Sequence, residues 1–193
     1  MNSALIISTS EQSASAVKNI LLQNYFTVIQ YAGSASEARK VLVERHFDLI
    51  LVNAPLKDEF GEGFAIDAAE KNTSQVIFIV NESIYEEASY KLEEYGIFTV
   101  SKPLNREVFL SVLKFANAAF NKISRLYGEQ DKLLRKLEDI KLVNKAKWLL
   151  IEKLSMTEEQ AHRSIEKQAM DMRLSRGEVS KIIIEKIQSE EER

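Results

Sequence analysis

The N-terminal part of the chain alternates short apolar runs with longer amphipathic stretches. Each run is rich in Val, Ile and Phe and is not interrupted by polar residues, which is typical of a parallel strand buried on both faces. The runs cover residues 4–7, 26–29, 49–52, 76–80 and 97–100. Amphipathic helices are expected between them, at residues 11–24, 35–46, 62–71 and 84–95. This alternation predicts an α/β fold, a doubly wound five-stranded parallel sheet whose site lies at the carboxyl ends of the strands.

The pattern changes at Asn105, after which no strand signal follows. Asn105 is a suitable N-cap for a helix, and beyond it apolar residues recur every seven positions, as in a coiled coil. The a and d positions of this repeat hold Ile123, Leu126, Gln130, Leu133, Leu137, Ile140 and Asn144. Because polar residues at a positions tend to fix register and oligomer state, a homodimeric coiled coil is expected. The alternative is a single amphipathic helix that packs on its own domain.

Two capping boxes mark helix starts nearer the C-terminus. Thr157 and Ser175 each precede a Gln or Glu by three positions, so that the hydroxyl and the later side chain satisfy opposite backbone donors. Three helices are therefore expected, at about residues 131–154, 158–172 and 176–188. The predicted domains are an α/β unit at 1–120, a coiled-coil linker helix at 121–136 and a small three-helix bundle at 137–193.

Composition excludes several kinds of chemistry. The 193 residues include no cysteine and only two histidines, His46 and His162. Disulfides, thiolate zinc sites and a cysteine nucleophile are excluded, and we expect no enzyme activity, no cofactor and no metal. No apolar stretch reaches the roughly 18 residues of a membrane span, and the first residues lack a basic signal-peptide opening. These features predict a cytoplasmic protein with no membrane partner.

Charge is distributed unevenly. Residues 1–125 carry 12 basic and 15 acidic side chains, whereas residues 135–181 carry 11 basic and 8 acidic ones. A positive stretch on a small helical domain is compatible with nucleic-acid binding, although most charged helix faces are simply solvated. Charge alone therefore leaves both interpretations open.

The sequence Ser101-Lys102-Pro103 follows the fifth apolar run. Together with the five βα units, it resembles the receiver domain of bacterial response regulators in two-component signalling, over residues 1–120. The resemblance implies an acidic pair that holds magnesium, a phospho-acceptor aspartate after the third strand, a hydroxyl after the fourth and a lysine after the fifth. In this chain the corresponding positions hold Ser8 and Thr9, Asn53, Val80 and Lys102.

These differences predict a pseudo-receiver, a degenerate phosphorylation site. An amide is too poor a nucleophile to accept a phosphoryl group, and Mg²⁺ requires hard anionic oxygens that Ser8 and Thr9 lack. We expect Lys102 to be a structural lysine that bonds Asn53 or a backbone carbonyl. Without phosphorylation, the protein would dimerise constitutively, respond to a regulatory protein or ligand at the pseudo-receiver, or be controlled by its expression.

Three ordered blocks in the C-terminal part carry a second resemblance. They cover residues 137–150, 156–162 and 168–171, with Leu174-Ser175 and Glu178-Val179 after the third block. This segment resembles the ANTAR domain, a family of RNA-binding transcription antiterminators. The resemblance implies a three-helix bundle that binds paired stem-loops in an mRNA leader and prevents a terminator hairpin from forming.

Helical spacing gives the first helix of this segment two faces. The expected core stripe is Val143, Ala146, Leu150 and Leu154. The opposite face carries two lysines that attract phosphates and an indole that can stack on an unpaired base. The expected RNA-binding residues are Lys141, Lys145, Lys147, Trp148, Arg173, Ser175 and Arg176. Trp148 stands where the family commonly has a small residue, so packing against a neighbouring helix or dimer partner is the alternative to stacking.

Two other classes of function compete with antitermination. Three small helices with a basic turn can also form a DNA-binding helix-turn-helix, although here the basic residues are dispersed over two helices. A dimeric adaptor that binds only protein is the other alternative. RNA in the form of tandem stem-loops is the partner that the ANTAR resemblance implies.

Overall fold

The computed structural model describes residues 1–24, 26–71 and 73–191. These residues form two compact units, Met1–Arg125 and Leu126–Arg193, which are considered separately below.

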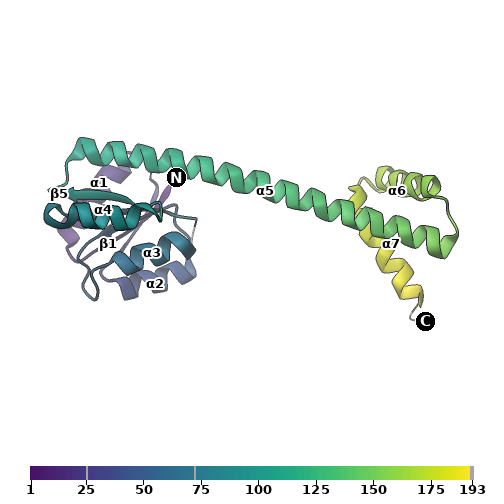
Figure 1. The fold of residues 1–193 in the computed structure, drawn as a ribbon, viewed down its shortest axis with the longest axis horizontal. Coiled ribbons are helices and arrows are strands. Elements are labelled where there is room, and N and C mark those ends of the chain that lie inside the picture. The colour runs from purple at the N-terminus through teal and green to yellow at the C-terminus, as the bar shows by residue number, and fades with distance from the viewer. Residues whose placement is uncertain (25, 72, 192–193) are drawn as a thin grey trace. The chain divides into compact units, whose positions relative to one another are not determined.

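The first unit is a parallel sheet flanked by helices (Figure 1). Its elements are β1 (Ser3–Ser8), α1 (Glu11–Leu22), β2 (Val28–Ala32), α2 (Ala35–Glu44), β3 (Leu49–Asn53), α3 (Glu62–Lys71), β4 (Gln75–Asn81), η1 (Glu82–Ile84), α4 (Tyr85–Glu93), β5 (Phe98–Lys102) and the start of α5 (Arg106–Leu154). The strand order is β2-β1-β3-β4-β5, and each neighbouring pair is parallel. The predicted doubly wound fold is confirmed.

Strand β2 lies two to three residues later than the apolar run 26–29 predicts. The backbone N–H of Phe26 bonds to the Leu21 carbonyl at the end of α1, so this residue is still part of the helix exit. Pairing with β1 begins at Val28 opposite Ser3. Phe26 is nevertheless buried, which explains why it belongs to the apolar run.

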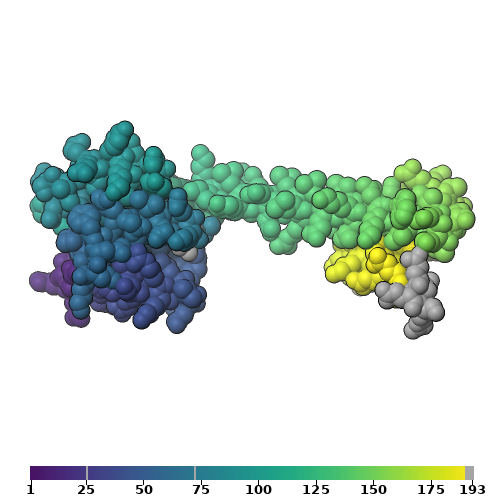
Figure 2. Space-filling view, turned by 60° about the horizontal axis from the view of Figure 1, so that its bottom comes forward, coloured from purple at the N-terminus to yellow at the C-terminus, as the bar shows by residue number. Residues whose placement is uncertain are grey.

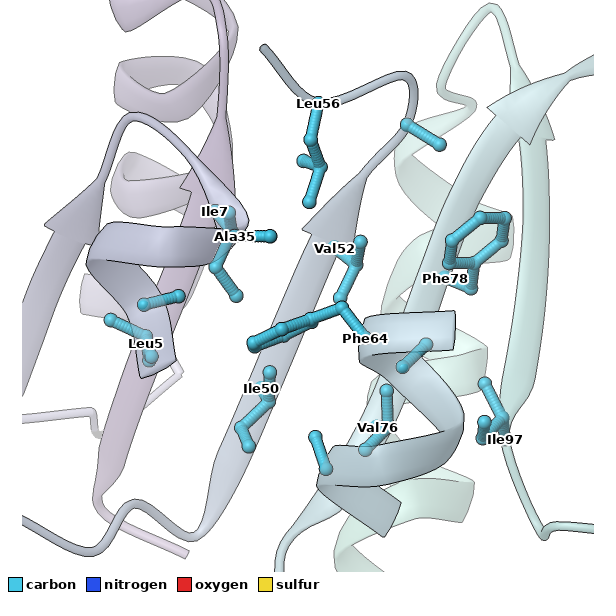
Figure 3. Packing of buried hydrophobic residues seen from close by; sticks show 14 of the residues in the cluster. Leu5, Ile7, Ala35, Ile50, Val52, Leu56, Phe64, Val76, Phe78 and Ile97 are labelled. Atoms are coloured by element: carbon cyan, nitrogen blue, oxygen red, sulfur yellow. The ribbon is translucent and has the colours of Figure 1, made fainter. Parts of the chain in front are cut away.

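The sheet is covered by an apolar core on each face. One core packs β1, β3 and β4 against α2, α3 and α4; Figure 3 shows Ile50 and Val52 of β3 facing Phe64 of α3. The other core packs the alternate strand residues, such as Leu49 and Leu51, against α1 and α5. Burial on both faces is the reason why the strands read as continuous apolar runs.

This alternation determines which side chains meet at the carboxyl edge of the sheet. Ser8 is paired with Asn53 in the β1–β3 register. In each strand, the residue two positions earlier lies in the core under α1 and α5. Lys102 ends β5 on that same side, two residues after the buried Val100. The strand order reverses direction between β1 and β3, where α/β sheets usually bind ligands.

The second unit packs the end of α5 against α6 (Glu158–Met172) and α7 (Arg176–Glu191). Both predicted capping boxes are present, one at Thr157 and one at Ser175. The core contains Ala146, Leu149, Leu150, Ala161, Ile165, Ala169, Val179, Ile183, Ile184 and Ile187.

One expected core position in this unit is wrong. Leu154 is 56% exposed, whereas Leu149, which the predicted stripe omits, is 6% exposed. Leu154 is the last residue of α5, and the chain turns at Ser155, whose φ is positive. Met156 then packs against the core in its place.

The predicted heptad positions lie on a continuous part of α5. Side chains at residues 121–141 are exposed in the single chain (Figure 2). The five apolar a and d residues range in exposed fraction from 37% at Ile123 to 60% at Leu133. An apolar stripe of this kind has no covering segment among the described residues. The linker boundaries at 121 and 136 stay a prediction.

Candidate functional site

A row of three exposed side chains follows one face of the last turns of α5. Lys141, Lys145 and Trp148 are spaced by four and three residues, which places them one above another on a helix. Trp148 is 59% exposed, and both lysines are exposed. Within the described residues neither lysine has an ion pair. This face therefore offers two available ammonium groups and an open indole.

Lys147 lies apart from this row. Its Nζ donates to Glu158 Oε1 at 3.0 Å, and its side chain is only 20% exposed. Glu158 is in the first turn of α6, so the ion pair joins two helices of the bundle. The structure thus separates Lys147 from the other two expected RNA-binding lysines.

The turn between α6 and α7 presents Arg173 in an unusual backbone conformation. Its φ is 56° and its ψ is 39°, the left-handed region that glycine normally occupies at the end of a helix. The backbone N–H of Arg173 bonds to the Met170 carbonyl, and that of Leu174 bonds to the Ala169 carbonyl. These bonds form a Schellman motif, and they leave the guanidinium of Arg173 on the surface.

Ser175 and Arg176 have structural partners next to this turn. The Ser175 hydroxyl accepts from the Glu178 N–H at 3.1 Å, and Glu178 Oε2 accepts from the Ser175 N–H at 2.7 Å. Hydrogen bonding of the Glu178 carboxyl to the backbone N–H and to the hydroxyl of Ser175 lowers the pKa of this carboxyl. Arg176 Nη1 lies 3.4 Å from Glu166 Oε1, although its side chain remains 59% exposed. Ser175 therefore holds the start of α7, and Arg176 retains an exposed charge.

The edge of the sheet in the first unit holds a small hydrogen-bond network. Ser8 Oγ donates to the Ser10 carbonyl at 3.1 Å and accepts from the Ser10 N–H at 3.2 Å and from Asn53 Nδ2 at 2.9 Å. Ser8 is fully buried. Because the Ser8 hydroxyl proton is donated to the Ser10 carbonyl, the Asn53 amide must be the donor in its bond to Ser8 Oγ. Asn53 Oδ1 is buried without a hydrogen-bond partner.

The other receiver-equivalent residues surround this network without completing it. Lys102 Nζ donates to the Ala54 carbonyl, and burial lowers the pKa of its ammonium. Val80 belongs to the core on the opposite face of the sheet, and Thr9 is exposed. The expected bond from Lys102 to a backbone carbonyl is present.

Magnesium, which the receiver resemblance implies, does not fit these residues. Ser8, Thr9 and Asn53 supply no carboxylate, and the described residues include no group of three or more potential metal ligands among His, Cys, Asp and Glu. Asp58, in the loop after Asn53, accepts from the Ser36 hydroxyl and from the backbone N–H groups of Ser36 and Ala35. These bonds hold the pKa of the Asp58 carboxyl far below its usual range. Asp58 therefore caps α2.

Three acidic residues with structural roles in the second unit were not anticipated from the sequence. Glu158 holds Lys147, Glu166 lies near both Arg176 and His162, and Asp139 of α5 packs against Gly177 of α7. A Cβ at position 177 would lie 2.0 Å from Asp139 Oδ1. The available signal for the Asp139 contact was Gly177 itself, because glycine is disfavoured inside a helix unless a neighbouring group leaves no room for a side chain.

Comparison with known proteins identifies the second unit. Residues 131–184 match the ANTAR domain. The transcriptional regulatory protein PdtaR of Mycobacterium tuberculosis is 25% identical over 166 residues, which cover 86% of this chain and 81% of that protein. The ANTAR match includes the row at residues 141–148 and the α6–α7 turn.

Solved structures resemble the first unit. A CheY-like response regulator receiver domain from Methanospirillum hungatei JF-1 has a TM-score of 0.57 at 20% identity and covers 63% of this chain and 98% of its own. An adenylate cyclase structure from Rhodopirellula baltica has a TM-score of 0.60 at 14% identity, covering 70% and 98%. At these identities the likeness shows the receiver fold alone. The chain thus combines a receiver-like fold with a segment that matches the ANTAR domain.

No helix in the described part of the chain is both long and apolar enough to span a membrane.

Proposed function

We propose that the protein is a transcription antitermination regulator that binds paired stem-loops in nascent mRNA through its ANTAR domain. The observation that carries the proposal is the exposed row of Lys141, Lys145 and Trp148 opposite the bundle core. Lysines bind phosphates wherever the backbone passes, whereas an indole needs an unstacked base. Hairpin loops present phosphates and unstacked bases together, whereas a regular duplex keeps its bases stacked.

Arg173 and Arg176 form the second part of the proposed interface. Both guanidinium groups are exposed at the turn into α7. The first N–H groups of a helix also favour phosphate, but Ser175 and Glu178 already occupy part of this terminus. We therefore assign the contribution of this turn to the two arginines, with Ser175 as the residue that positions them. Lys147 contributes only where RNA displaces Glu158.

Two chains are proposed to act together through the apolar stripe of a and d residues on α5. A stripe of apolar side chains exposed on a lone helix is stabilised when a second copy covers it. Its polar a positions, Gln130 and Asn144, favour one register. A dimer presents two ANTAR domains to one RNA, so binding of the first hairpin raises the effective concentration of the second.

The receiver-like unit is proposed to work without phosphorylation, as a pseudo-receiver. Asn53 occupies the strand end at which a receiver carries its phospho-acceptor, and its amide is bonded to Ser8. An amide nitrogen is not a nucleophile for phosphoryl transfer. On incubation with acetyl phosphate and magnesium, the intact mass should stay unchanged; a stoichiometric, base-labile phosphate would contradict this part of the proposal.

The central experiment compares RNA with DNA. Tandem hairpins with randomised loops are selected on the full chain, and the best RNA is titrated beside a DNA duplex of equal length at about 150 mM salt, where non-specific binding is weak. We expect the hairpin pair to bind at least tenfold more tightly than the duplex and to bind two chains. Equal affinities would contradict antitermination, and preferential binding of the duplex would favour the DNA-binding alternative.

A further inference from the structure

A small cavity lies beside the Ser8–Asn53 network in the receiver-like unit. Its volume is about 260 Å³, and it is lined by residues of α1, of the carboxyl-terminal parts of β3, β4 and β5, and of the segment after β5. Ligand pockets usually measure roughly 300–1,000 Å³, so this cavity suits a ligand smaller than a nucleotide. It lies near the point where the strand order reverses, the usual ligand position in this sheet type.

The walls of the cavity are mainly apolar and carry one cation. Among the described residues that line it, Lys102 is the only charged one, and the others of use here are Ser13, Ala16, Val17, Ile79 and Leu104. The Lys102 ammonium is half-buried and bonds only to the Ala54 carbonyl, so within the described structure it has no carboxylate partner. Burial lowers the pKa of this ammonium, as expected for a charge that lacks a counter-ion.

An organic anion would supply the missing counter-ion. A carboxylate needs few donors, and the cavity provides the Lys102 ammonium and the Ser13 hydroxyl. Phosphate is less suitable because its oxygens require several donors, whereas one of the two amide N–H groups of Asn53, which also lines the cavity, is committed to Ser8. The apolar walls in turn require an apolar tail on the ligand.

We propose that this cavity binds a short-chain apolar monocarboxylate, with its carboxylate on Lys102 and its tail between Val17, Ile79 and Leu104. The receiver-like unit would then receive a chemical signal at the edge of the sheet where receivers receive a phosphoryl group. The inference does not depend on RNA binding, and it is tested on the full chain without RNA.

The probe is 4-methylpentanoate, followed by NMR through the methyl groups of Val17, Ile79 and Leu104. Acetate has the charge without the tail, 4-methylpentan-1-ol has the tail without the charge, and inorganic phosphate tests for simple anion binding. We expect saturable shifts of these methyl groups and an affinity at least tenfold above that of each of the three other compounds, because only this probe combines a buried apolar tail with a charged hydrogen bond to Lys102. No saturable shift would overturn the proposal, as would equal binding of acetate or phosphate.

Variants separate the two parts of the site. Lys102→Met should weaken binding of 4-methylpentanoate at least tenfold. Ala16→Leu fills the cavity from an exposed position of α1 and should also weaken it, whereas Gln12→Leu adds the same side chain to an exposed position of α1 outside the cavity and should have no effect. Unchanged binding to Lys102→Met and Ala16→Leu, with melting curves that show folded protein, would overturn the proposal.

Discussion

Replacing Lys141 and Lys145 together with glutamine removes two cations from α5 without disturbing the bundle. Both side chains are exposed, and within the described residues neither forms an ion pair. Glutamine has a helix propensity close to that of lysine. The free energy of unfolding should therefore change by less than about 0.5 kcal/mol, the usual range for such surface positions.

The effect on RNA binding can be estimated from counterion release. Each phosphate neutralised by a lysine contributes about 0.7 to the slope of log affinity against log salt on a single strand, and about 0.9 on a duplex. Loss of both lysines should thus reduce the magnitude of the slope by about 1.4–1.8. At a salt concentration near 0.15 M, this corresponds to a loss of affinity of about 14- to 30-fold.

The assay is fluorescence polarisation of a labelled tandem-hairpin RNA from about 50 to about 300 mM salt, the range in which such slopes are measured. Lys147→Gln is the matched control, because it removes the same charge from the same helix at a position paired with Glu158. Its slope should match that of the unmodified protein. An unchanged slope for the double variant, or an equal change for the control, would refute the assignment of the interface to this face.

The other predictions concern stacking, backbone strain and acid stability. Trp148→Ala should weaken RNA binding by about 1–3 kcal/mol with little change in melting temperature. Leu149→Ala, the control in the core, should lower the free energy of unfolding by about 2–5 kcal/mol in denaturant melts. Comparable losses of stability in the two variants would mean that the indole is packed. Arg173→Gly should raise the free energy of unfolding by about 1 kcal/mol because it relieves a left-handed conformation, yet it should weaken RNA binding. Ser155→Gly relieves a similar conformation and should stabilise the fold without changing RNA binding. Weakened RNA binding by both variants would argue against a role for the Arg173 guanidinium. The lowered pKa of Asp58 means that its carboxylate stabilises the fold above the pKa of the unfolded chain, and this contribution disappears as pH falls through the folded pKa. Asp58→Asn should therefore lose less stability than the unmodified protein on acidification below about pH 4, measured by circular dichroism, and parallel profiles would contradict the capping role.

The fold could be predicted to a large extent because its signals are local. A strand buried on both faces is a continuous apolar run, as at residues 49–52, and a capping box is visible in four residues, as at Thr157. Boundaries were less accurate where tertiary contact decides them. Phe26 is apolar because it is buried at the exit of α1, and nothing in the run itself separates that role from membership of β2.

The candidate site was predictable only in part because partners distant in sequence decide which charges are available. Helical spacing placed Lys141, Lys145 and Trp148 on one face, and the structure exposes all three. Helical spacing did not reveal that Glu158 holds Lys147, because this ion pair depends on the packing of α6 against α5. Nor did it reveal the left-handed conformation of Arg173, since the turn lacks the glycine that usually marks one.

The cavity beside Asn53 shows the same limit at the sheet edge. The receiver resemblance predicted that this edge lacks the acidic side chains of a receiver. The space near Lys102, however, is formed by α1, β4 and the segment after β5, whose side chains meet only in the folded unit. The sequence pattern thus predicted what the edge lacks, whereas the structure was required to locate a site there.

A single-round transcription assay tests antitermination most directly. The template places the selected hairpin pair in the leader so that the second hairpin overlaps the stem of a terminator. The unmodified protein should increase read-through in proportion to the RNA bound, and the variant lacking Lys141 and Lys145 should require about 14 to 30 times more protein for the same effect. Unchanged read-through when the RNA is saturated with protein would contradict the proposed function.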